Sequence, residues 1–156
     1  MKKEDKTIIN TLVSDVDFLL KQVDELDGKL SVNIENIHEH AHLVTAAYHL
    51  NGIYSCLEDV FFKIAKVFEN RVENPSSWHR ELLERMRIDV RNIRPHVISG
   101  KTYPLLDEMR RFRHVFRSSY MFSLKRPQVE LLARQWDEGK RGIKKEITLF
   151  LRAVEK

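Results

Sequence analysis

The sequence predicts an all-α protein, an antiparallel bundle of four or five helices in a single domain over residues 1–156. A chain of 156 residues with 42% hydrophobic residues is long enough to bury its own core. Only 5 Gly and 4 Pro leave few turns for a many-stranded β-fold. Apolar residues instead recur at steps of three and four, the spacing of amphipathic helices.

The first half of the chain predicts two long helices. The first has an apolar stripe from Ile9 to Leu26 and is expected to end at Gly28, a plausible C-cap. The second is expected from about residue 33 to about residue 70. Gly52 lies in the middle of the second helix, where the missing side chain lets a neighbouring helix approach.

The second half predicts three more helices. Their expected positions are 78–90, 103–120 and from Pro127 onward, with a turn at 74–77 and a loop over 92–102. Gly139 and Gly142 weaken the middle of the last helix. A continuous final helix and a helix broken near these glycines therefore both stay open.

Composition excludes several classes of protein. The chain has no long apolar run and no apolar signal region, so we expect no membrane segment and a cytoplasmic location. Cys56 is the single cysteine, which excludes an internal disulfide and fits a reducing compartment. Because Cys56 lies within an apolar helical run, we interpret it as a small buried hydrophobe and not as a nucleophile.

The charge is distributed unevenly. The net charge is +4, but residues 80–126 carry 12 basic against 5 acidic residues, whereas residues 1–45 carry 5 basic against 9 acidic residues. The basic excess is mostly arginine, which binds phosphate in a bidentate geometry. The basic segment is therefore either a site for a polyanion or an internal partner of the acidic first helix.

The densest motif is the segment RRFRHVFRSSY at residues 110–120. On a helix, Arg113, Arg117 and Tyr120 share one stripe, with Arg110 close to it. Three aligned cations repel one another unless an anion compensates them. The motif predicts a phosphate-binding strip at Arg110, Arg113 and Arg117, in which His114 is the side chain that titrates near neutral pH. The alternative is that the arginines bind the acidic first helix.

A metal site is the weaker possibility. His38 and His42 are four residues apart, and on one helix face this spacing can chelate zinc. No cysteine accompanies them, and the chain has no paired-cysteine or HExxH pattern. Histidine pairs of this kind are more often solvated, so we expect no metal and no cofactor.

Four segments carry a resemblance to a known family: YHLNGIYSCLE at 48–58, WHRELL at 78–83, IRP at 93–95 and LDEMRRFRHVFRSSY at 106–120. Together they resemble the HepT-like proteins of the HEPN superfamily. These are ribonuclease toxins of toxin–antitoxin pairs, and the antitoxin is a minimal nucleotidyltransferase. The resemblance implies an all-α fold and an RNA substrate.

The motif of this family is an Arg, four to six residues, a His and, two positions later, often a Tyr. Arg113 and Tyr120 match it, and Ser118 stands in the His position. In the family the motif serves metal-free RNA cleavage by attack of the 2′-hydroxyl. Here Arg113 and Arg117 would supply the positive charge, and His114 is the candidate base, because serine has no useful pKa.

The resemblance also implies a homodimer and a modification. Residues 113 and 118 lie 140° apart on one helix, so a cleft between two copies would let both face one phosphate. Tyr120 is the implied acceptor of AMP from the nucleotidyltransferase partner. The expected function is a metal-independent endoribonuclease controlled by adenylylation. The alternative, favoured by Ser118, is a non-catalytic module that binds the nucleotidyltransferase or a nucleotide.

Overall fold

The computed structural model describes residues 3–70, 78–118 and 124–156 and confirms the all-α prediction. Its five helices are α1 (Lys3–Ile34), α2 (His40–Glu69), α3 (Trp78–Met86), α4 (Tyr103–Ser118) and α5 (Arg126–Glu155). In these ranges the only β-type pairing is an isolated bridge between Val90 and Arg94. No described helix combines the length and the apolar character needed to cross a membrane.

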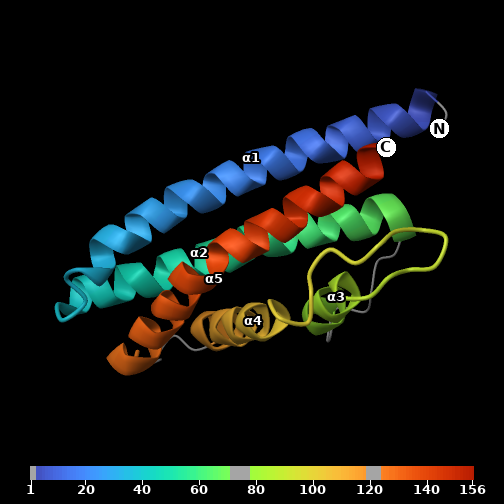
Figure 1. Ribbon diagram of the computed structural model, residues 1–156. Coiled ribbons are helices and arrows are strands. Elements are labelled where there is room, and N and C mark those ends of the chain that lie inside the picture. The colour runs from blue at the N-terminus through green and yellow to red at the C-terminus, as the bar shows by residue number, and fades with distance from the viewer. Residues whose placement is uncertain (1–2, 71–77, 119–123) are drawn as a thin grey trace.

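The helices form two groups around α2. The long helices α1, α2 and α5 lie side by side, and the short helices α3 and α4 pack on another side of α2 (Figure 1). Within the described residues, α1 contacts α2 and α5 but neither α3 nor α4. One of our two interpretations, in which the acidic first helix is the partner of the arginine-rich α4, is therefore wrong.

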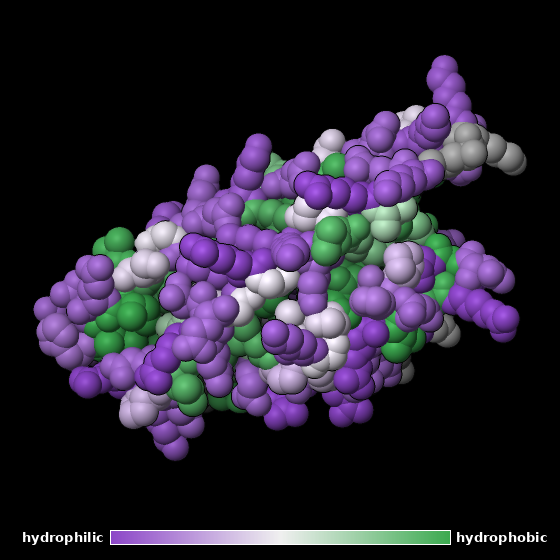
Figure 2. All heavy atoms as spheres, in the orientation of Figure 1, coloured by the Kyte–Doolittle hydropathy of each residue, from purple (hydrophilic) through white to green (hydrophobic). Residues whose placement is uncertain are grey.

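The core runs along the length of α2. Residues spaced by three and four along α2 face inward, as its amphipathic pattern predicts. The largest fully buried side chains come from four helices and one loop: Trp136, Tyr54, Phe61, Leu50, Leu83, Leu106 and Ile98. Figure 2 shows the complementary arrangement, with hydrophilic side chains covering most of the visible face and apolar atoms between the helices.

Three predicted helix boundaries are wrong. α1 continues through Gly28 to Ile34, and α2 begins at His40 rather than near residue 33. The helix predicted over 78–90 ends at Met86. Gly28 is tolerated because a helical glycine costs only about 1 kcal/mol, which the buried stripe of α1 offsets. Asn70 ends α2 in the left-handed conformation with φ of 47°. The predicted turn at 74–77 lies outside the described residues.

Two glycines allow close approaches between helices. A Cβ atom at Gly52 of α2 would lie 3.3 Å from Leu26 Cδ1 of α1, as the sequence predicted. A Cβ at Gly139 of α5 would lie 2.6 Å from Leu105 Cδ2 of α4. α5 is nevertheless continuous through both Gly139 and Gly142, which settles the question that the sequence left open.

The loop between α3 and α4 is held by a buried arginine. The side chain of Arg94 is fully buried and lies against Glu69 at the end of α2, with Nη2 3.4 Å from Oε2. Its Nη1 also donates to the Pro95 carbonyl at 3.0 Å, and Nη2 donates to the Arg85 carbonyl at 3.1 Å. Arg85 itself pairs with Glu69. This network ties the loop to both α2 and α3.

Two acidic residues of α1, Asp27 and Asp24, are paired with α5. Asp27 accepts hydrogen bonds from Trp136 Nε1 at 2.8 Å and from Lys140 Nζ at 2.9 Å. One turn earlier, the more exposed Asp24 pairs with Lys144. The hydrogen bonds that Lys140 donates to Asp137 and Asp27 raise its pKa above the usual value. Asp27 thus satisfies the indole N–H of the largest core side chain.

We expect Asp27→Ala to lower the free energy of unfolding by about 1–3 kcal/mol, because it leaves the buried Trp136 N–H without an acceptor. Asp24→Ala removes an exposed pair of the same two helices and should cost no more than about 1 kcal/mol. Urea unfolding followed by circular dichroism measures both. Equal losses in the two variants would contradict this role of Asp27.

Candidate functional site

The arginine-rich helix α4 presents different arginines to different environments. Arg113 lies on the inward face with Leu106 and Met109, and it is only 5% exposed. Arg117, one turn later and about 40° further around the helix, is exposed. The predicted stripe is therefore not one open surface. Its centre points into the protein, and its carboxyl end points to solvent.

Arg113 is bound inside the protein by α2. Its Nη2 donates to Glu58 Oε1 at 2.7 Å, and its Nη1 donates to Ser55 Oγ at 3.2 Å. Its guanidinium carbon lies 5.1 Å from the centre of the Tyr54 ring, within the range of a cation–π contact. Burial and the nearby Glu58 carboxylate raise the pKa of Tyr54, so this phenol stays neutral. In the structure the guanidinium of Arg113 therefore faces α2 and not the solvent, and its binding of phosphate stays a prediction.

The same carboxylate also holds a histidine of α3. His79 Nδ1 lies 2.9 Å from each of the two carboxylate oxygens of Glu58. It also lies 3.1 Å from Arg113 Nη2. The side chain of Glu58 is 6% exposed, whereas that of His79 is 37% exposed. Glu58, Arg113 and His79, from α2, α4 and α3, therefore form one polar cluster that extends from the interior to the surface.

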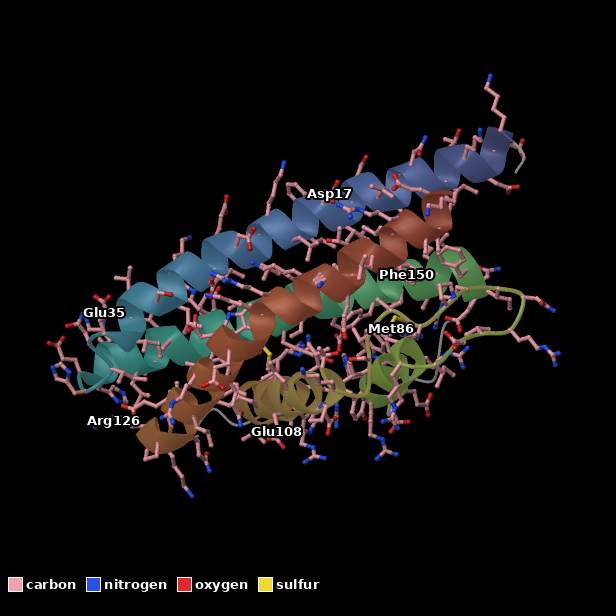
Figure 3. The ribbon with its side chains drawn as sticks, in the orientation of Figure 1. Asp17, Glu35, Met86, Glu108, Arg126 and Phe150 are labelled. Atoms are coloured by element: carbon pink, nitrogen blue, oxygen red, sulfur yellow. The ribbon has the colours of Figure 1, made fainter. Side chains whose placement is uncertain are left out.

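Two other arginines of α4, Arg110 and Arg111, are paired within the helix. Arg110 donates to Asp107 Oδ1 from Nε at 3.0 Å and from Nη2 at 2.8 Å. Arg111 pairs with the other oxygen of Asp107 at 2.8 Å and with Glu108 at 3.5 Å. Glu108 lies on the side of α4 away from α2 (Figure 3). Arg110, Arg111 and Arg113 are therefore neutralised within the protein. The acidic residues that neutralise them belong to α2 and to α4 itself.

The remaining motif residues lie toward the end of α4. His114 is exposed, about 100° around the helix from Arg113. Ser118 is the last residue of α4. Tyr120, the implied AMP acceptor, lies outside the described residues. Among the described residues Arg117 forms no ion pair, so its guanidinium is the part of the predicted strip best placed for a phosphate.

The possible metal pair does not have helical geometry. His38 lies in the turn before α2, and His42 lies in its first turn. His42 Nδ1 is 3.0 Å from Asn33 Oδ1, so this histidine joins the end of α1 to the start of α2. No group of three or more metal-binding side chains occurs in the described ranges.

Cys56 is half-buried, and its Sγ lies 3.9 Å from Gln22 Oε1. Burial and the charge of Asp59 raise the pKa of its thiol, which disfavours the reactive thiolate. Both effects agree with its interpretation as a structural residue.

The sequence analysis assigned no role to Glu58, Ser55 or His79. Glu58 could have been noticed in the sequence, because it is an acidic residue inside the apolar run of a helix. A buried carboxylate in such a position needs a partner. His79 gave no such signal, since its contact with Glu58 depends on how α3 packs on α2. The sequence analysis singled out Arg113 but could not show that its side chain points into the protein.

The fold and the cluster define a class of protein, a helical bundle in which an arginine-rich helix is fixed to a long central helix by a buried ion pair. The family model described as HepT-like protein matches residues 45–154, so the chain belongs to the HepT-like family. The match begins within α2 and ends within α5, so α1 precedes it. No curated protein and no solved structure matches the chain.

We expect Glu58→Gln to destabilise the protein by about 3–5 kcal/mol, because it leaves the charge of the buried Arg113 without its counter-ion. The matched control is Glu108→Gln, which removes an exposed carboxylate paired with Arg111 on the same helix and should cost no more than about 1 kcal/mol. Thermal and urea unfolding measure both. A loss below about 1 kcal/mol for Glu58→Gln would show that the pair is not essential to the fold.

Proposed function

We propose that this HepT-like protein is a metal-independent endoribonuclease of the toxin type, controlled by a minimal nucleotidyltransferase. The observation that carries the proposal is the polar cluster formed by α2, α3 and α4: the guanidinium of Arg113, fixed by Glu58 beside the imidazole of His79, with the exposed Arg117 one turn along α4. Cleavage by a 2′-hydroxyl needs a cation for the phosphorane and a group that moves a proton. The cluster contains both kinds of group.

The roles of the arginines differ in this proposal. Arg117 contacts the RNA phosphate, because its side chain is exposed at the end of α4. Arg113 is a positioning residue, since its guanidinium is already engaged with Glu58 and Ser55. Arg110 is held by Asp107 and adds positive potential without a fixed phosphate contact.

The protein acts as a homodimer in this proposal. Val115 is 45% exposed on the outward side of α4, and Arg117 is exposed about 160° around the same helix. Twofold packing around the carboxyl end of α4 would bring the two Arg117 side chains to one groove. This groove would then combine positive charge from two copies, which suits a single-stranded RNA backbone.

A second candidate function is a module that binds the nucleotidyltransferase or a nucleotide without cleaving RNA. Ser118 in the position of the motif histidine favours it, as does the internal engagement of Arg113. This candidate shares the exposed Arg117 but predicts no strand cleavage.

The purified protein should cleave single-stranded RNA in the presence of EDTA. Arg117→Ala should lower kcat/KM by about 10–100-fold, the loss expected for one hydrogen-bonded contact to a charged phosphate. Arg111→Ala on the same helix, whose guanidinium is occupied by Asp107 and Glu108, should change it little. Gel analysis of end-labelled RNA measures the rate. RNA binding without cleavage by the folded protein would favour the binding module instead.

Incubation with a minimal nucleotidyltransferase and ATP should add AMP to Tyr120 and stop cleavage, because the added phosphate repels RNA from the arginines. Intact-mass and peptide mass spectrometry measure the addition. Tyr120→Phe should stay unmodified and active under the same conditions. Modification of Tyr120→Phe to the same extent would place the acceptor elsewhere.

A further inference from the structure

His79 lies where the buried cluster reaches the surface. Its Nδ1 is 2.9 Å from both oxygens of a carboxylate that is almost fully buried, while the imidazole itself is more than one-third exposed. The two ring nitrogens point in diverging directions. With Nδ1 toward Glu58, Nε2 points away from the carboxylate.

The partners of Nδ1 determine where the ring carries its proton. The carboxylate of Glu58 accepts hydrogen bonds and cannot donate them. Arg113 Nη2 can only donate, and it already donates to Glu58 Oε1 at 2.7 Å. Nδ1 lies 2.9 Å from both carboxylate oxygens, a contact that is favourable only when Nδ1 carries a proton, so we assign the N–H to Nδ1. In this tautomer Nδ1 and Nη2, which are 3.1 Å apart, both donate to Glu58, and the lone pair of the neutral ring is on Nε2.

Aromatic contacts fix the plane of the ring. The centre of the Trp78 ring lies 4.0 Å from that of His79 with an interplanar angle of 33°. Trp78 in turn packs edge-on against Phe62 of α2, at a centroid distance of 5.8 Å. Trp78 also packs against the apolar core, so the imidazole is held in place beside Glu58.

We infer that His79 is the catalytic base of the ribonuclease site, with Glu58 as its positioning residue. The inference rests on the proposed ribonuclease function. It supplies the imidazole that the motif lacks, because Ser118 stands in the position of the motif His. A carboxylate on Nδ1 fixes the tautomer and stabilises the imidazolium that forms when Nε2 takes a proton. Arg113, beside the ring, adds positive potential, and Arg117 is the arginine that contacts the phosphate.

The proton transfers balance with this one imidazole. Nε2 takes the proton of the 2′-hydroxyl as the 2′-oxygen bonds to phosphorus. The bond between phosphorus and the 5′-oxygen then breaks, and the 5′-oxygen takes the proton back from Nε2. The products are a 2′,3′-cyclic phosphate and a free 5′-hydroxyl, and the neutral imidazole is restored.

His114, the base that the sequence suggested, is in a different environment. It starts about 100° around α4 from Arg113 and lies on the exposed face. Glu58 faces the interior, where its described partners are Arg113 and His79. The carboxylate of Glu58 therefore fixes the ring of His79.

The test uses the full chain, EDTA and a mixed-sequence pool of single-stranded RNA. His79→Asn keeps an N–H donor toward Glu58 and removes the second ring nitrogen, so it should fold normally and bind RNA with unchanged affinity. Its kcat should fall by about 10²–10⁴-fold. His79→Ala should lose a similar factor, and added imidazole should restore part of its activity, which a structural role would not allow. Cleavage should yield cyclic phosphate ends and should not occur in a fully 2′-deoxy pool.

Three comparisons decide the outcome. His96→Ala removes an exposed imidazole paired with Asp89 in the loop after α3, and it should cleave like the wild type. If the wild type cleaves and both His79 variants cleave equally well, the inference is wrong and the ribonuclease function stands. Loss of activity that imidazole does not restore, or activity that depends on His114 instead, also overturns it. No cleavage by the folded wild type would overturn the proposed function and this inference together.

Discussion

The buried carboxylate of Glu58 is the constraint around which α2, α3 and α4 are arranged. A charge removed from water in an apolar helix face is stable only with close partners, and Glu58 has two, Arg113 and His79. The ion pair fixes the rotation of α4, since a turn of one residue would carry the guanidinium away. The contact to His79 fixes α3 in the same way. Apolar packing alone would permit several rotations of these short helices.

The sequence predicted the helical class well, because helical periodicity is a local signal. The long helices α2 and α5 follow from their apolar spacing and from Pro127 near the start of α5. Helix boundaries were predicted less well where the prediction depended on a single residue. Gly28 has the chemistry of a C-cap, yet the apolar stripe continues beyond it to Leu30, and burial of that stripe outweighs the local preference.

The candidate site was predicted in its composition but not in its orientation. A helical wheel places Arg113 and Arg117 on one stripe, which is correct for the helix taken alone. It cannot show that Glu58, 55 positions earlier, turns Arg113 inward. His79 depended even more on tertiary packing, since its partner lies on another helix. Family membership is likewise clear from several short segments together, although the motif position that would define the chemistry holds Ser118.

The second buried carboxylate of α2, Glu69, has a mechanical consequence. Glu58 and Glu69 are eleven residues apart, about 16 Å along the helix and nearly on the same face. One holds α3 and α4 through His79 and Arg113, and the other holds the connecting loop through Arg94. A segment held by one contact could rotate about that contact, whereas a segment held by two separated contacts cannot. We therefore expect the loop and its two flanking helices to move with α2 as one rigid body.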